Sequence, residues 1–263
     1  MHHHSLPLRN KSFRVYLGST LFFLSIIVST VLVGPIILAC IVFPFAVRYK
    51  IAGYWIDFIL MMVTLCCGIR WKVEGLEHIE NIDAAIVLSK HQSAWETVAL
   101  RKILPPQTAL LKESLLWLPV WGWALATLKP IAIDRSNQIG ALRTLIDKGT
   151  SYLKEGLWVV VFPEGTRTAP GEKRKFNAGG AMLAQKSGFP VIPVAHNAGE
   201  YWPRYSFLKY PGLITVKIGP PIESKNRKAS DINAEAEAWI ERAMTEIGST
   251  HSASAINNYQ VTP

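Results

Sequence analysis

Cysteine is scarce in this chain of 263 residues, which has three. Cys40, Cys66 and Cys67 all lie within apolar N-terminal segments, away from the polar motifs further along the chain. The sequence therefore offers no disulfide framework, no cysteine-based zinc site and no thiol nucleophile, and we expect neither a metal nor a resident cofactor. This distribution is typical of a reducing compartment, so we expect the polar part of the chain to face the cytoplasm.

The Gly-x-Ser-x-Gly turn that presents the nucleophile of α/β hydrolases is also missing. Its absence argues against a soluble α/β hydrolase. It also argues against a mechanism that passes through an acyl-serine intermediate.

Charged residues are absent from Val15 to Val47, and this uncharged run is mostly apolar. A removable signal peptide has an apolar core of about 7–15 residues, so the run is too long to be one. A straight helix of this length, at ~1.5 Å per residue, would overshoot a ~30 Å hydrocarbon core. We therefore expect bends at Gly34-Pro35 and at Pro44.

A second apolar run, from Ile51 to Ile69, carries Asp57 as its one charged residue. The two runs predict a bent hairpin of two membrane-associated helices within residues 1–70. Basic residues flank both runs, so the sequence leaves open whether the hairpin crosses the bilayer or lies in one leaflet. One-sided insertion is the interpretation that we favour.

Positive charge gathers around these apolar runs. The formal net charge is +9, and residues 1–70 carry five of these charges. Near anionic lipid headgroups each Lys or Arg contributes about 1 kcal/mol. The combination favours a phospholipid bilayer as partner, and no nucleic acid; a basic excess that only aids solubility is the alternative.

From Gly75 onward, short β-branched runs alternate with longer mixed segments. The alternation predicts an α/β domain over residues 71–248, with a mostly parallel central sheet flanked by helices. Residues 249–263 are polar and small, and we expect a flexible tail there. The expected strands are Ala84–Leu88, Thr108–Leu111, Pro130–Ile133, Leu157–Phe162, Val191–Ala195 and Leu213–Ile218; the expected helices are Trp95–Ile103, Leu115–Leu128, Gln138–Glu155, Ala178–Ser187 and Asp231–Glu246, the last with Asp231 as N-cap.

The first polar motif is His91-Gln92-Ser93-Ala94-Trp95-Glu96, which follows an expected strand and begins an expected helix. Glu96 can accept a hydrogen bond from one ring nitrogen of His91, which leaves the other nitrogen free to take a proton. This logic operates in serine hydrolase triads, but here the hydroxyl would belong to the substrate. The alternative is that Glu96 is only a favourable charge near a helix N-terminus.

The second motif is Phe162-Pro163-Glu164-Gly165-Thr166-Arg167, directly after the most apolar expected strand. A glycine in such a turn lets the backbone approach a ligand, and Arg167 offers a fork of donors that suits a phosphate. The carboxyl end of a buried strand is also where α/β sheets usually bind ligands. A plain turn with a solvated arginine is the alternative.

Two more blocks follow the same order along the chain, Lys129 to Arg135 and the strand Val191 to Val194, which contains Pro193. Together the four blocks resemble the glycerolipid acyltransferase family, and most of all bacterial 1-acyl-sn-glycerol-3-phosphate (lysophosphatidic acid) acyltransferases. The similarity covers about residues 73–221. His91 and Glu96 match the histidine and acidic pair, Arg135 the basic residue of the second block, Phe162 to Arg167 the third block without change, and Pro193 the fourth; Lys112-Glu113 and Leu118 to Trp123 resemble the stretch between the first two blocks.

The resemblance implies an acyltransferase that moves a fatty acyl chain from acyl-CoA or acyl carrier protein, a thioester co-substrate, to the sn-2 hydroxyl of 1-acylglycerol-3-phosphate. The product would be phosphatidic acid, made at the cell inner membrane for phospholipid biosynthesis. His91 would be the general base and Glu96 would orient it, although aspartate is usual at the latter position. The substrate-binding set would be Lys112, Arg135, Glu164, Gly165, Thr166 and Arg167, with the three basic residues toward phosphate.

Two other functions fit the same residues. The acceptor could be another lyso-lipid, such as a lyso-ornithine lipid or lysocardiolipin, because the basic residues favour a phosphate without choosing among phosphates. The chain could also be a catalytically inactive lipid-binding protein of the same fold. Retention of both His91 and a carboxylate at position 96 argues against inactivity.

Overall fold

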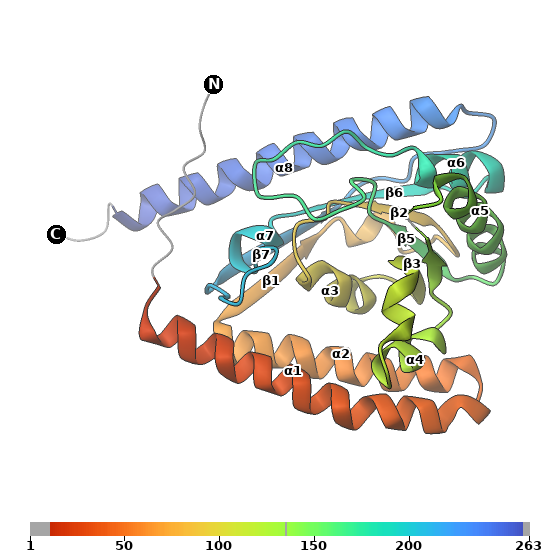
Figure 1. Cartoon of the computed structure of the whole chain (residues 1–263). Helices are drawn as coiled ribbons and strands as arrows, with labels where there is room; N and C mark the ends of the chain where they lie inside the picture. The colour runs from red at the N-terminus through yellow and green to blue at the C-terminus, as the bar shows by residue number, and fades with distance from the viewer. Residues whose placement is uncertain (1–10, 135, 260–263) are drawn as a thin grey trace.

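The computed structural model describes residues 11–134 and 136–259, and a seven-stranded sheet forms its centre. The strand order is β1-β7-β6-β2-β5-β3-β4 (Figure 1). Neighbouring strands run parallel except β6 and β7, which are antiparallel. The bounds are β1 Ile69–Glu74, β2 Ile86–Ser89, β3 Gln107–Lys112, β4 Ile131–Ile133, β5 Trp158–Val161, β6 Val191–His196 and β7 Gly212–Ile218.

The sheet confirms the expectation of a mostly parallel, helix-covered core. Every residue of β2, β5 and β6 is buried, as befits strands covered on both faces. Each large apolar side chain buried there contributes about 1.5–3 kcal/mol relative to an exposed one. Proline is usual in edge strands, but Pro193 lies in β6, an interior strand of the sheet. The Pro193 carbonyl accepts from the Gly219 N–H, just before the ladder between β6 and β7 begins at Val194.

All six expected strands are present, and β1 is an addition. Its residues Ile69 to Glu74 alternate apolar and charged side chains, which is a strand signal. The expectation missed it because Ile69 was assigned to the preceding apolar run. The strand pairs in parallel with β7 at the edge of the sheet.

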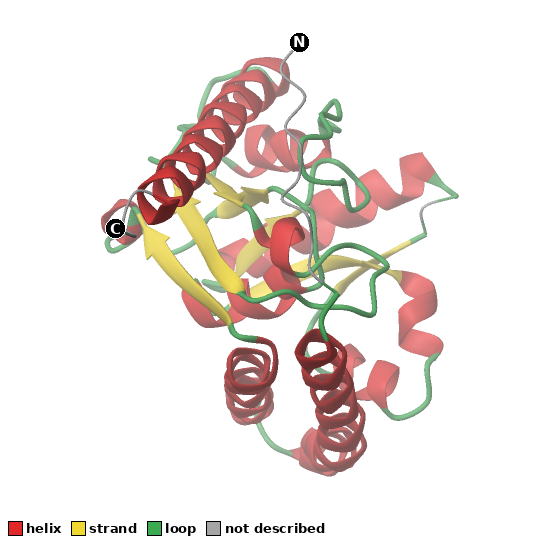
Figure 2. Ribbon diagram, turned by 90° about the vertical axis from the view of Figure 1, so that its left-hand side faces the viewer, coloured by secondary structure: helices red, strands yellow, loops and turns green. Residues whose placement is uncertain are grey.

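Helices cover both faces of the sheet (Figures 1 and 2). Three of them, α3, α5 and α6, agree closely with expectation. The segment expected as one helix over Leu115–Leu128 is instead broken by Leu118-Pro119-Val120, where Val120 has a φ of 64°. The bounds are α3 Trp95–Ile103, η3 Glu113–Trp117, α4 Trp121–Ala126, α5 Gln138–Lys154, α6 Gly179–Ser187, α7 Ala198–Tyr201 and α8 Ala229–Tyr259, with a short η2 at Leu76–His78.

The last helix corrects two expectations. It begins at Ala229, so Asp231 lies inside the first turn and is not the N-cap. It also continues to Tyr259 through the segment expected as a flexible tail from residue 249. Neither glycine nor proline occurs between residues 249 and 260, so nothing in that sequence breaks a helix already under way. Residues 260–263 lie outside the described part of the chain.

The N-terminal hairpin consists of α1 (Phe13–Ala39), the short η1 (Cys40–Val42) and α2 (Phe45–Cys67), which lie side by side (Figure 2). Both helices are long and apolar enough to cross a membrane. The helix continues through Pro35, so the expected bend there is not a break; the chain turns at Pro44, which precedes α2. Gly18 lets the helices approach closely, because a Cβ there would meet the backbone oxygen of Cys66 at 2.1 Å.

The hairpin is docked on the α/β domain at several points along its length. The Tyr49 hydroxyl at the start of α2 accepts from the Gln107 N–H at 2.9 Å, and Asp57 pairs with Lys102 at 2.9 Å. Near the start of α1, Ser19 Oγ accepts from the Lys209 N–H at 2.9 Å. The hairpin therefore lies along one side of the domain, below α3 and α4 in Figure 1.

Candidate active site

The carboxyl ends of neighbouring strands bring together residues that are far apart in sequence. Strand β2 lies between β5 and β6, with Leu88 opposite both Val161 and Pro193. The turn after β2 carries His91, the turn after β5 carries the segment from Phe162 to Arg167, and β6 ends at His196. Because all three strands run in the same direction, these residues meet at one edge of the sheet.

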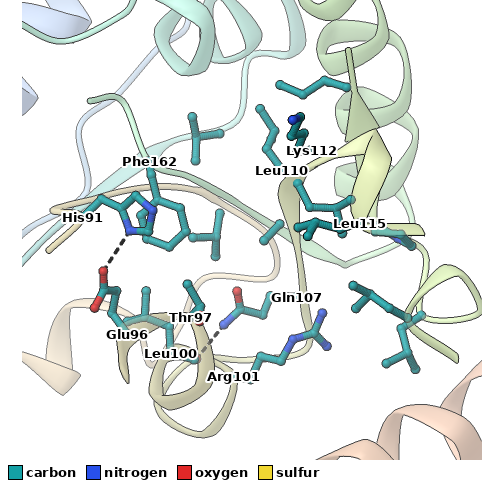
Figure 3. Close-up of a pocket in the computed structure, with 18 of the residues that line it drawn as sticks. His91, Glu96, Thr97, Leu100, Arg101, Gln107, Leu110, Lys112, Leu115 and Phe162 are labelled. Carbon is teal, nitrogen blue, oxygen red and sulfur yellow. Dashed lines mark hydrogen bonds and ion pairs between the residues drawn. The ribbon is translucent and has the colours of Figure 1, made fainter. Parts of the chain in front are cut away.

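His91 and Glu96 form a hydrogen-bonded pair (Figure 3). His91 Nδ1 lies 2.8 Å from Glu96 Oε1. The same oxygen accepts from the backbone N–H groups of Gln92 at 2.9 Å and Ser93 at 2.8 Å. Glu96 is wholly buried in the first turn of α3, so its carboxylate both holds the His91 ring and binds the amides at the helix N-terminus. The two interpretations of Glu96 from the sequence are thus compatible.

The position of the His91 ring is fixed on two sides. It stacks on the Phe162 ring with centroids 4.1 Å apart and planes inclined by 19°. A carboxylate can only accept, so Nδ1 is the donor to Glu96 and the neutral ring presents Nε2 as a lone pair. The His91 side chain is 13% exposed and borders a large cavity. This arrangement is the one that a general base needs.

Next to His91 lies a buried ion pair between Lys90 and Glu164. Lys90 Nζ contacts Glu164 Oε1, while Oε2 accepts from the His91 N–H at 3.2 Å and from Thr168 Oγ1 at 3.0 Å. Burial raises the pKa of the Glu164 carboxyl, against the opposing effect of Lys90. Glu164 therefore supports the turn that carries His91 and does not line the cavity, in contrast to its expected place in the substrate-binding set.

A second histidine faces the free side of Glu96. His196 Nε2 lies 4.0 Å from Glu96 Oε2, and both side chains are fully buried. Burial alone would raise the pKa of Glu96, but His196, the hydrogen bond from His91 and the Ser93 N–H hold it below its ordinary value. The carboxylate is thus charged at neutral pH.

The other expected substrate residues are distributed unevenly. Gly165, Arg167 and Lys112 line the cavity, and Gly165 has a φ of 72°, which glycine adopts without strain. Thr166 is half-buried in the same turn but does not line the cavity. Arg135 lies outside the described residues. Lys112 at the end of β3 and Arg167 in the turn after β5 are therefore placed on the same cavity as His91.

The cavity has a volume of about 980 Å³ and extends from His91 to the N-terminal hairpin. Figure 3 shows His91 and Phe162 on one side and Leu110, Lys112 and Leu115 on the other. Its wall is mostly apolar and comes from both parts of the chain: Val33, Ile37 and Ile56 of the hairpin, Leu100 of α3, Leu125 of α4, and Leu142 and Leu145 of α5. Such a space suits a long aliphatic group whose polar end lies at His91.

The comparisons with known proteins agree with this geometry. The sequence model of the Acyltransferase family matches residues 70–197. The 1-acyl-sn-glycerol-3-phosphate acyltransferase of Pseudomonas aeruginosa is 46% identical over 210 residues, which cover 78% of this chain and 81% of that protein. The chain belongs to the acyltransferase family. It is thus an O-acyltransferase.

More distant members of the family extend the comparison. The 1-acyl-sn-glycerol-3-phosphate acyltransferase of Saccharomyces cerevisiae is 30% identical over 77% of this chain and 68% of that protein. The crystal structure of the 1-acyl-sn-glycerophosphate acyltransferase PlsC from Thermotoga maritima matches with a TM-score of 0.75, covering 89% of this chain and 96% of that one. Its sequence is 24% identical, so this structure confirms the fold.

Several residues at or beside this candidate site were not predicted from the sequence. Lys90 and His196 are charged or polar side chains buried beside the His91 turn, and Arg101 and Gln107 line the cavity where α3 meets β3. For His196 a signal existed, because a polar residue at the end of an apolar strand is expected at the ligand edge of a parallel sheet. For Arg101 and Gln107 the sequence contains no comparable signal, because they line the cavity only once α2 is docked on the α/β domain.

Proposed function

We propose that this acyltransferase moves a fatty acyl chain from acyl-CoA or acyl carrier protein to the sn-2 hydroxyl of 1-acylglycerol-3-phosphate, giving phosphatidic acid for phospholipid biosynthesis. The observation that carries the proposal is the His91–Glu96 pair at 2.8 Å on an apolar cavity of about 980 Å³ that Arg167 and Lys112 also line. The names of the relatives support the choice of acceptor.

In the proposed reaction His91 is the general base. Its Nε2 takes the proton of the acceptor hydroxyl as that oxygen attacks the thioester carbonyl. The tetrahedral intermediate then collapses, the C–S bond breaks, and the thiolate leaves and takes up the proton from the imidazolium. Glu96 keeps the ring in the Nδ1–H tautomer and stabilises its charged form. A positioned general base accounts for about 10²–10⁴ in rate.

Arg167 and Lys112 are proposed to bind the acceptor's phosphate, with Arg135 as a third contributor. A guanidinium binds phosphate through two parallel hydrogen bonds, whereas an ammonium acts as a point charge. The phosphate and the reacting hydroxyl belong to one glycerol unit, so the cations must lie on the same cavity as His91. Arg167 and Lys112 meet this condition.

We infer that the hairpin inserts into the cytoplasmic leaflet of the cell inner membrane from one side. Tyr49, Asp57 and Ser19 tie both helices to the α/β domain along its side. A hairpin that crossed the bilayer in this arrangement would pull the charged domain in with it. A cysteine at the exposed Val42, in a variant with all native cysteines replaced by alanine, should then resist an impermeant maleimide added outside intact cells. Labelling there would favour a crossing hairpin.

The decisive assay measures acyl transfer by the purified full chain in detergent or liposomes. Labelled oleoyl-CoA and palmitoyl-acyl carrier protein are offered with a panel of lyso-lipids that includes lysocardiolipin and a lyso-ornithine lipid. We expect phosphatidic acid from 1-acylglycerol-3-phosphate, and no product from His91→Ala. His78→Ala is the matched control, because that ring binds the Ile218 carbonyl outside the site. Product with only another acceptor, or none at all, would overturn the proposal.

A further inference from the structure

His196 is a buried ionisable residue that the proposed reaction does not use. It ends β6 and is fully buried. Its Nε2 lies 2.8 Å from the Lys90 carbonyl oxygen, and its Nδ1 accepts from the Ala198 N–H at 3.3 Å. A carbonyl oxygen can only accept, so the ring carries one proton, on Nε2. Burial lowers the pKa of His196, in agreement with a neutral ring.

The two oxygens of Glu96 have different surroundings. Oε1 accepts three hydrogen bonds, from His91 Nδ1 and the N–H groups of Gln92 and Ser93. Oε2 is buried, and among the described residues it accepts no hydrogen bond. His196 Nε2 lies 4.0 Å from it. The second oxygen therefore lies beside the His196 ring, whose N–H group is held by the Lys90 carbonyl.

We propose that His196 is a positioning residue for acyl transfer, which keeps the Glu96 carboxylate aimed at His91. The Lys90 carbonyl holds the His196 ring, and the N–H edge of that ring favours the charged oxygen beside it. A glutamate side chain has three torsions, so a carboxylate fixed at one oxygen alone can still pivot. The inference rests on the proposed role of His91, because a misplaced Glu96 matters only where His91 must accept a proton.

The expected effect lies in turnover and not in acceptor binding. His196 does not line the cavity, unlike Arg167 and Lys112. A misplacement of a catalytic group by about 1 Å can cost on the order of 10²-fold in rate. We therefore expect His196→Asn to lower kcat by about 10- to 100-fold and to change the acceptor KM by less than about threefold.

His196→Gln is the matched variant. The glutamine amide nitrogen can reach the place of Nε2 and donate to the Lys90 carbonyl, whereas the asparagine nitrogen reaches only the place of Nδ1. The kcat of His196→Gln should be at least about tenfold higher than that of His196→Asn. Thermal unfolding of both variants shows whether they fold alike, and His78→Ala controls for loss of a half-buried imidazole bonded to a strand carbonyl.

A double-mutant comparison separates positioning from a general structural role. In a Glu96→Gln background, His196→Asn should change kcat by less than about threefold, because the carboxylate it acts through is gone. The same loss in both backgrounds, or wild-type kcat in His196→Asn, would overturn the inference while leaving the acyl-transfer proposal intact. A wild-type protein with no acyl transfer to 1-acylglycerol-3-phosphate would instead refute the proposed function itself.

Discussion

Replacing Glu96 by glutamine tests the proposed mechanism most directly. The amide oxygen can still accept from the Gln92 and Ser93 N–H groups, so the helix N-terminus keeps its partners. What the variant loses is the negative charge 2.8 Å from His91 Nδ1. The perturbation thus removes the charge that would stabilise His91 when it takes a proton, together with the charge beside His196.

The expected magnitude follows from the strength of that interaction. A hydrogen bond to a charged group contributes about 1.5–3 kcal/mol, against about 0.5–1.5 kcal/mol for a neutral one. The difference, of order 1–1.5 kcal/mol, corresponds to about tenfold in kcat. Glutamine can also donate to Nδ1, which favours the tautomer with its proton on Nε2 and removes the base. We therefore expect kcat of Glu96→Gln to fall by about 10²-fold or more, with the acceptor KM little changed.

Initial rates with labelled oleoyl-CoA and saturating 1-acylglycerol-3-phosphate give the kcat comparison. Glu235→Gln is the control, because it removes a carboxylate of similar size from an exposed pair with Arg227, and such pairs contribute little. A Glu96→Gln enzyme within about threefold of wild-type kcat would refute the proposed role of the carboxylate. In that case His91 would act without it, or would not act as the base.

Three further predictions concern the same edge of the sheet. Arg167→Ala should raise the acceptor KM by about 10- to 100-fold, since a charge-assisted phosphate contact is worth about 1.5–3 kcal/mol; an unchanged KM for phosphate-bearing acceptors would contradict this. Gly165→Ala should destabilise the protein by about 1–2 kcal/mol in urea unfolding, because Gly165 has a positive φ. It should also lower activity more than Gly171→Ala, since a Cβ at Gly165 would meet Asn177 at 3.0 Å whereas a Cβ at Gly171 has open space. Because the pKa of Glu96 is depressed in the folded state, its carboxylate stabilises the fold above the ordinary pKa of 4.5, and this contribution is lost as pH falls through the folded-state pKa. The difference in urea midpoint between wild type and Glu96→Gln should therefore shrink from pH 6 to pH 3.5. A constant difference would contradict the assigned direction.

Much of the fold could be predicted because strand and helix signals are local. The β-branched runs of β2, β5 and β6 indicated buried parallel strands, and Trp95–Ile103 was predicted with its observed bounds. What failed depended on context. The break at Pro119-Val120 and the continuation of α8 past residue 249 are decided by neighbouring elements and by the absence of a breaker, which propensity alone weighs poorly.

The site was predicted in part for a similar reason. His91 and Glu96 are five residues apart, so one turn brings them together whatever the sheet does. Glu164 was expected to contact substrate because it belongs to the Phe162–Arg167 motif, yet its side chain pairs with buried Lys90. His196 could be placed beside Glu96 only once β6 was known to neighbour β2. The strand order, which no local pattern records, thus determines which buried groups surround His91 and Glu96.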